Sequence, residues 1–166
     1  AGIRIDRAHG GTVVDYDRDG DYDLVIGTSM MRWSADDNPP RPDRQYMYVL
    51  RNDVGQDSNR IMIHLEGAGA PGANTSAIGA RIEIRAGDDL YVREVSGSYG
   101  VDGYQNDLFQ IVGVGEHCEV DEVLIRWPNA EHSTTSIPNV PANYVLRVHE
   151  TEGFSFQTLE EYTSAE

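Results

Sequence analysis

The sequence predicts an all-β protein that begins with a β-hairpin and ends in a β-sandwich or barrel. Apolar and charged residues alternate in several short segments, for example at residues 81–85, where Ile82 and Ile84 stand between charged neighbours. Such alternation is typical of strands with one buried face. Turn-forming residues, such as the Gly-Asp-Asp run at 87–89, separate these segments at short intervals. This spacing is typical of sandwiches and barrels.

The N-terminal hairpin is expected to fold around an acidic loop at residues 15–23, which has the spacing D-x-D-x-D-G-x-x-D. Alternate residues in this pattern can direct their oxygen atoms toward one centre. Two carboxylates about 4 Å apart repel by roughly 4 kcal/mol at an effective dielectric constant near 20, so the loop favours a bound cation. Calcium fits best because it accepts about six to eight oxygen ligands in a flexible shell. We expect ligation by the side chains of Asp15, Asp17, Asp19 and Asp23 and by the backbone carbonyl of Asp21, with a sharp turn at Gly20.

Strands, rather than the helices of an EF-hand, are expected on both sides of this loop. Residues 12–14 and 24–26 are β-branched and apolar, which favours strands. The twelfth position of the loop holds Ile26, whereas an EF-hand needs a bidentate glutamate there. The alternative to a calcium loop is an acidic turn that is solvated and binds no ion.

The remaining chain divides into short predicted strands and two connections. Residues 30–43 contain three prolines and are expected to be irregular, because proline interrupts helices. Residues 67–72, with the sequence GAGAPG, are the expected boundary between two units. Predicted strands cover residues 23–28, 45–51, 60–66, 81–85, 90–95, 108–112, 123–127 and 144–148. We therefore expect a repeat at residues 1–66, a sandwich at 72–150 and a C-terminal tail at 151–166.

The composition limits the possible partners. The chain carries 28 acidic and 13 basic residues, a net charge of −15, which disfavours nucleic acid and anionic membrane surfaces as partners. No apolar run approaches the roughly 18 residues of a membrane span, so we expect no membrane insertion. Cys118 is the only cysteine, which excludes a disulfide framework and a zinc site built from several thiolates.

Several segments resemble known families. The start of the chain, with AGI at 1–3, HGG at 9–11 and the run VVDYDRDGDYDLVIGT, is similar to one FG-GAP/VCBS repeat, the calcium-binding blade unit of integrin-type β-propellers. The segments NTSAIGARIEIRAG, VREVSGSYG, VDEVLIRWPN and IPNVPANYVLRVHE resemble the ASPIC/UnbV domain that follows such repeats in proteins similar to cartilage acidic protein. The resemblance implies a propeller-like calcium repeat joined to an ASPIC/UnbV-like sandwich, in a longer secreted or cell-surface protein with further repeats.

A polar loop at residues 98–107 is the best candidate for a ligand-facing surface. Its candidate residues are Tyr99, Asp102, Tyr104 and Asn106. An aromatic face beside amide and carboxylate groups suits a sugar or a peptide. The alternative, in which the tyrosines pack back onto the edge of the sandwich, agrees equally well with the sequence.

These features predict a non-enzymatic function: a calcium-stabilised extracellular adhesion or recognition module that binds a protein or a glycan. One alternative is a hydrolase that acts on glycans through a pair of carboxyl groups. The carboxyl groups available for such a pair are those of Glu94, Asp102, Asp107 and Glu122. The other alternative is a structural spacer that binds only calcium and its own neighbours. The sequence contains neither a G-x-S-x-G nor an H-E-x-x-H motif, so nucleophilic and zinc-dependent hydrolysis have no support from motifs.

Overall fold

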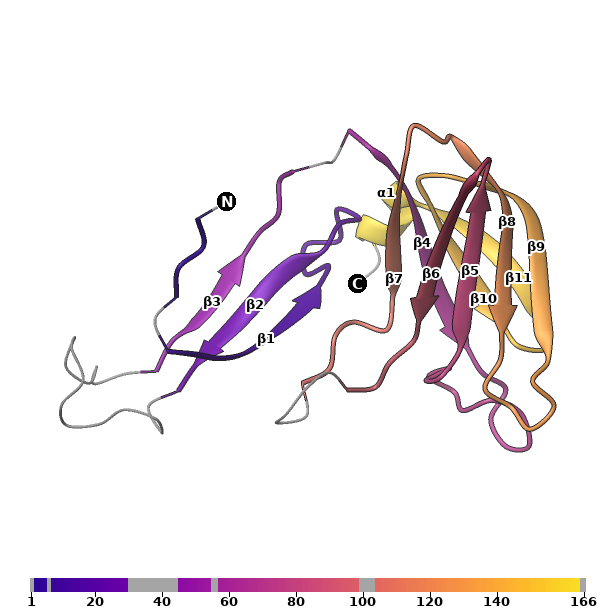
Figure 1. Cartoon of the computed structure of the whole chain (residues 1–166), viewed down its shortest axis with the longest axis horizontal. Coiled ribbons are helices and arrows are strands. Elements are labelled where there is room, and N and C mark those ends of the chain that lie inside the picture. Colours follow the sequence, from indigo (N-terminus) through magenta and orange to yellow (C-terminus); the bar gives the residue numbers. More distant parts are fainter. Residues whose placement is uncertain (1, 6, 30–44, 55–56, 99–103, 165–166) are drawn as a thin grey trace.

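The computed structural model describes residues 2–5, 7–29, 45–54, 57–98 and 104–164. These residues form three antiparallel or mixed sheets and one short helix, α1 (Leu159–Ser164). Figure 1 shows a three-stranded sheet beside a larger two-sheet body, with α1 close to the loop that joins the first two strands.

The three-stranded sheet is the N-terminal hairpin extended by one strand. It contains β1 (Ala8–Val14), β2 (Asp23–Thr28) and β3 (Met47–Leu50) in the order β1-β2-β3. Both neighbouring pairs are antiparallel, and Val14 pairs with Asp23 at the end of the first pair. This pairing closes the acidic loop immediately beyond the sheet.

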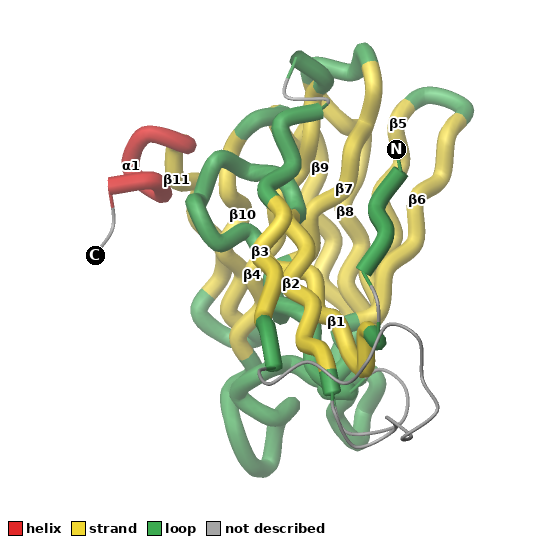
Figure 2. Tube along the Cα trace, turned by 90° about the vertical axis from the view of Figure 1, so that its left-hand side faces the viewer, coloured by secondary structure: helices red, strands yellow, loops and turns green. Residues whose placement is uncertain are grey.

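Two four-stranded sheets form the larger body. Their strands are β4 (Asn59–Glu66), β5 (Arg81–Ala86), β6 (Asp89–Glu94), β7 (Gln110–Gly115), β8 (Glu119–Arg126), β9 (Thr134–Pro141), β10 (Tyr144–His149) and β11 (Gly153–Thr158). One sheet has the order β11-β10-β4-β7 and the other has the order β6-β5-β8-β9. All neighbouring strands are antiparallel except β4 and β10, which are parallel. In Figure 1 the strands β6, β5, β8 and β9 lie side by side in front of β10 and β11, and Figure 2 shows the sheets after a turn of 90° about the vertical axis.

The main core lies between these two sheets. The inward residues of β4 and β5, including Ile61, Ile63 and Ile82, are fully buried in it, and Trp127 after β8 is 2% exposed. The alternation that the sequence shows at residues 81–85 therefore has its apolar side in this core. Fully burying one such side chain stabilises the fold by about 1.5 to 3 kcal/mol. The predicted all-β sandwich is confirmed.

A second, smaller apolar cluster covers the outer face of the sheet that contains β4. Met62, Ile111, Val145 and Tyr162 are buried there, together with Tyr22, Phe109 and Leu159. These residues come from the acidic loop, from β4, from the start of β7, from β10 and from α1. Strand β4 is consequently buried on both faces, although the sequence pattern predicts only one buried face.

The strand pairing differs from the expected division of the chain. Strand β4, which the expected repeat at residues 1–66 includes, lies between β10 and β7 in the sandwich. Strand β11, which the expected tail at 151–166 includes, pairs with β10 along its whole length. The sandwich therefore includes strands before and after the expected range 72–150. Strand β4, from before this range, pairs in parallel with β10, which lies far along the chain.

Candidate metal centre

The loop between β1 and β2 brings three of the predicted ligands together. One carboxylate oxygen from each of Asp15, Asp17 and Asp19 lies within 4.8 Å of the other two. Asp15 is 5% exposed, whereas Asp17 and Asp19 are half-buried. The alternation of residues in the loop therefore places the three carboxylates around one point.

Several carboxylate oxygens of this loop are buried and accept no hydrogen bond. They are Oδ1 of Asp15, Oδ1 of Asp17 and both carboxylate oxygens of Asp21. Buried polar atoms in proteins are almost always paired, and an unpaired one costs about 1 to 3 kcal/mol. A cation bound among these oxygens would satisfy them, and oxygen donors of this kind fit calcium.

Other carboxylate oxygens of the loop accept backbone hydrogen bonds that stabilise its turn. The N–H of Gly20 donates to Oδ2 of Asp15 at 3.1 Å, and the N–H of Asp21 donates to Oδ1 of Asp19 at 3.2 Å. Gly20 has a φ of 89°, a conformation that glycine adopts without a Cβ clash. The sharp turn therefore lies at Gly20, where the sequence predicts it.

Asp23 and Asp21 have positions that differ from those of the three clustered aspartates. Asp23 is 1% exposed, and its two oxygens accept the N–H groups of Tyr16 at 3.1 Å and Asn52 at 2.8 Å. Asp23 thus ties both ends of the loop to the chain after β3. Asp21, predicted to offer its backbone carbonyl, also has its carboxylate buried in the loop.

Burial and, to a smaller extent, the neighbouring charges raise the pKa of two of these carboxyl groups. Burial raises the pKa of Asp15 to about 6, an effect opposed by the N–H of Gly20 and increased by the charge of Asp19. Burial also raises the pKa of Asp21, and the charge of Asp19 adds to that rise. The loop therefore holds negative charge at a free-energy cost that a bound cation would remove.

The loop docks on the outer face of the sandwich through residues that the motif does not include. Arg60 on β4 is 9% exposed and donates from Nη2 to the carbonyl oxygen of Asp19 at 2.7 Å. The hydroxyl of Tyr22 donates to the carbonyl oxygen of Phe109 at 2.6 Å and accepts the N–H of Ile111 at 3.0 Å. These partners are distant in sequence, so the loop sequence contains no signal for them.

The candidate ligand surface at residues 98–107 is described only in part. Tyr99 and Asp102 lie outside the described residues. The hydroxyl of Tyr104 lies 2.9 Å from Nδ1 of His9, and its ring lies over Gly10. Oδ1 of Asn106 accepts the N–H of Val13 at 3.1 Å. Tyr104 and Asn106 thus join the chain before β7 to strand β1.

Of the four carboxyl groups named for hydrolysis, those of Glu94 and Glu122 lie on strands that pair with distant positions of β5. Glu94 pairs with Arg81, and Glu122 pairs with Arg85, on opposite sides of β5. Four residues along a strand span about 13 Å, whereas glycosidase carboxyl groups lie about 5 to 9.5 Å apart. Asp107 instead accepts the N–H of Phe109 at 3.0 Å, and Asp102 lies outside the described residues.

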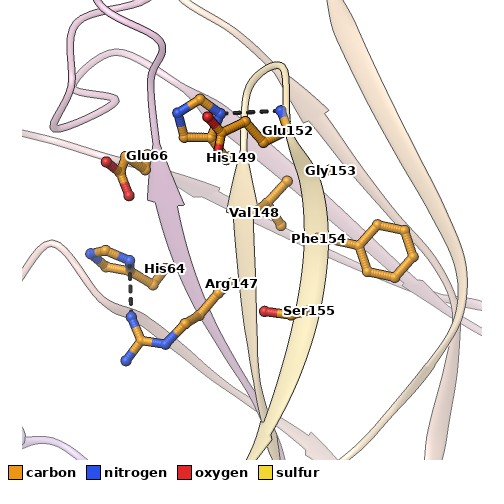
Figure 3. A pocket seen from close by; sticks show the side chains of 9 residues that line it. All are labelled: His64, Glu66, Arg147, Val148, His149, Glu152, Gly153, Phe154 and Ser155. Carbon is orange, nitrogen blue, oxygen red and sulfur yellow. Dashed lines mark hydrogen bonds between the residues drawn. The ribbon is translucent and has the colours of Figure 1, made fainter.

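Several polar side chains line a depression of about 260 Å³ on the outer face of β4, β10 and β11 (Figure 3). Nη1 of Arg147 lies 3.4 Å from Nδ1 of His64, and Nε of Arg147 donates to Gln157 at 2.9 Å. Burial, and then the charge of Arg147, lowers the pKa of His64. Nδ1 of His149 accepts the N–H of Glu152 at 3.2 Å. These side chains therefore form hydrogen bonds with one another or with the nearby backbone, and we interpret them as structural groups.

Comparison with known proteins identifies the C-terminal part of the chain. The family model described as ASPIC and UnbV matches residues 70–154, about half of the chain. This range contains strands β5 to β10 and the first residues of β11. No curated protein matches the chain. Within the described ranges, no helix has the length and apolar character needed to cross a membrane. The chain belongs to the ASPIC and UnbV family.

Proposed function

We propose that the loop at residues 15–23 binds calcium and that the ion has a structural role, fixing the N-terminal sheet on the sandwich. The observation that supports this proposal best is the group of buried carboxylate oxygens without donors, on Asp15, Asp17 and Asp21. An acidic turn that binds no ion would expose such oxygens to water. Here Asp15 is 5% exposed, and one of its oxygens lies in the cluster with Asp17 and Asp19.

The chemistry of the donors favours calcium over other cations. The three clustered groups are all carboxylates, which are hard oxygen ligands. Magnesium requires a nearly ideal octahedron and keeps several waters, whereas calcium accepts a larger and less regular set of oxygens. Extracellular calcium modules bind with dissociation constants of about 10⁻⁴ to 10⁻³ M, and we expect a value in that range.

We further propose that residues 1–66 are related to FG-GAP/VCBS repeats and that the parent protein is similar to cartilage acidic protein. In this proposal the chain is a calcium-stabilised recognition module of a secreted or cell-surface protein, without enzymatic activity. Its partner is an extracellular protein or a glycan. The exposure of Met47 and Val49 on one face of β3, at 72% and 46%, supports a protein partner, because partner binding often covers exposed apolar patches.

A thermal melt in EGTA, calcium or magnesium tests the calcium site. At a calcium concentration ten times the dissociation constant, binding stabilises the folded state by about 1.4 kcal/mol. The melting temperature should then rise by about 3 to 6 °C. Magnesium at the same concentration should produce a smaller rise.

Two variants give this experiment its control. Asp19→Asn should abolish the calcium-dependent rise, because it removes one of the clustered charges. Asp88→Asn removes the same charge from an exposed turn between β5 and β6 and should preserve the rise. A wild-type melting temperature that is identical in EGTA and in calcium would refute the calcium site.

A further inference from the structure

Helix α1 is a short element whose position depends on other parts of the chain. Its start is capped reciprocally: the N–H of Glu161 donates to Oγ1 of Thr158 at 3.2 Å, and the N–H of Thr158 donates to Oε2 of Glu161 at 2.8 Å. This is a capping box, which favours a helical turn. A helix of six residues is nevertheless marginal in water without tertiary contacts.

Those contacts lead directly to the acidic loop. Oγ1 of Thr163 donates to the carbonyl oxygen of Arg18 at 2.9 Å. The side chain of Tyr162 lies close to the carboxyl group of Asp15. The Tyr162 ring packs against Phe109 with centroids 5.4 Å apart and is 7% exposed. The helix therefore rests partly on the sandwich and partly on the loop.

The two loop residues that α1 approaches belong to the cluster of carboxylates that would hold the ion or lie between its members. Asp15 belongs to the cluster, and Arg18 lies between its other members, Asp17 and Asp19. Arg18 has a φ of 59°, a left-handed conformation that costs a non-glycine residue about 1 kcal/mol or more. Without a cation, repulsion among the carboxylates favours a wider loop, which moves the Arg18 carbonyl away from Thr163.

We infer that cation binding in the loop strengthens the docking of α1, so that the stability of this helix depends on whether the loop holds a cation. This inference rests on the proposed calcium site and adds a structural response of α1 to calcium binding. Because coupling between two equilibria is reciprocal, contacts made by α1 also strengthen cation binding. The ion thus joins residues 15–19 to residues 159–164 across the outer face of β4 and β7.

Hydrogen exchange of the full chain, followed by mass spectrometry in EGTA and in saturating calcium, tests this coupling. Loss of one hydrogen bond corresponds to about a fivefold change in an equilibrium constant. Amides of residues 159–164 should therefore exchange about fivefold to tenfold more slowly in calcium. Proteolysis by a glutamate-specific protease provides a second measurement, since Glu160 and Glu161 lie in α1 and cleavage there should slow in calcium.

Three variants test cation binding, the contact between α1 and the loop, and the helix alone. Asp17→Asn, which leaves α1 intact, should remove the calcium-dependent protection. Thr163→Val keeps the shape of the side chain but removes the bond to Arg18, and it should weaken calcium binding and lower the protection by about fivefold each. Ser164→Ala is the matched control, because the Ser164 hydroxyl bonds within the helix, to the carbonyl of Glu161 at 3.3 Å, and it should retain both properties.

The outcomes distinguish this inference from the proposed function. If calcium raises the melting temperature but exchange at residues 159–164 is the same in EGTA and calcium, the coupling is wrong and the calcium site stands. Unchanged calcium affinity and unchanged protection in Thr163→Val would also overturn the coupling. If titration calorimetry detects no calcium binding to the wild-type chain, the proposed site is wrong and the coupling falls with it.

Discussion

Nη2 of Arg60 donates a hydrogen bond of 2.7 Å to the carbonyl oxygen of Asp19. This bond joins a central strand of the sandwich to the loop of the candidate metal centre. Arg60 also places a positive charge near Asp21, where it favours the ionised carboxylate. One side chain therefore positions the loop and offsets part of its negative charge.

Replacing Arg60 by methionine should destabilise the fold in the absence of calcium. Arg60→Met keeps an apolar stem of similar length but loses a hydrogen bond from a charged donor, worth about 1.5 to 3 kcal/mol. Urea denaturation in EGTA measures the loss. Arg93→Met, at an exposed position on β6, is the control and should change stability by less than about 0.5 kcal/mol. Equal effects of the two variants would contradict the role of Arg60.

A second prediction concerns Gly20, whose replacement tests how closely the loop approaches β4. A Cβ at Gly20 would lie 2.7 Å from Nε of Arg60, and φ at Gly20 is 89°. Gly153 has a similar φ of 99°, but a Cβ there would have no atom within 4 Å. Gly153→Ala should cost about 1 to 2 kcal/mol for the left-handed backbone alone.

Gly20→Ala should cost about 1 kcal/mol more than Gly153→Ala, because the added methyl displaces Arg60 from Asp19. Chemical denaturation of both variants under the same conditions gives the difference. A difference of zero would mean that the loop is free to move away from β4 without loss.

The hydroxyl of Tyr22 provides a third test, because it closes the edge of the sandwich before β7. Tyr22→Phe leaves the carbonyl of Phe109 and the N–H of Ile111 without this partner. We expect a loss of about 1 to 2 kcal/mol, measured as a shift of the urea midpoint. Tyr46→Phe, at a side chain that is 49% exposed, should be nearly neutral. A neutral Tyr22→Phe would show that the hydroxyl contributes nothing to docking.

The fourth prediction concerns pH and the carboxylate of Glu150. The N–H groups of Ala68 and Ala73 each donate to Oε2 at 2.8 Å, and Asn129 donates to Oε1 at 2.7 Å. The bond from Ala68, followed by those from Asn129 and Ala73, lowers the pKa of Glu150 below its ordinary value of 4.5. A lowered folded-state pKa gives a stabilisation that is complete above pH 4.5 and disappears as the pH falls through the lower folded value.

Glu150→Gln should therefore be less stable than the wild type at pH 7, by up to about 1 kcal/mol, because water screens this partly exposed carboxylate. The two stability curves should approach each other as the pH falls below 4.5 and through the lower folded-state pKa of Glu150. Urea denaturation across this pH range measures both curves. Glu152→Gln, an exposed neighbour, should run parallel to the wild type, and a constant gap between Glu150→Gln and the wild type down to acid pH would contradict the ionic role.

The sequence predicts those parts of the fold that depend on local pattern. Alternation identifies Ile82 and Ile84 as inward residues because a strand repeats every two residues, whatever it packs against. The acidic motif likewise predicts the cluster of Asp15, Asp17 and Asp19 and the turn at Gly20, because all of these contacts lie within one loop.

Other features depend on distant contacts that a local pattern does not contain. The sequence around Met62 does not indicate that this side chain is buried. The parts that cover it, Tyr22 and α1, come from opposite ends of the chain. The positions of β4 and β11 in the sandwich could not be predicted for the same reason. Both join β10, and the sequence pattern of a strand does not specify its neighbours.

The parallel pairing of β4 with β10 also affects the order of assembly during synthesis. β4 leaves the ribosome before the rest of its sheet, whereas β10 emerges only after β5 to β9. Until then, the apolar run at residues 61–63 can pair only with β7 on one side. An unpaired apolar strand is prone to aggregate, so the nascent chain needs β10 to complete this sheet before intermolecular pairing occurs.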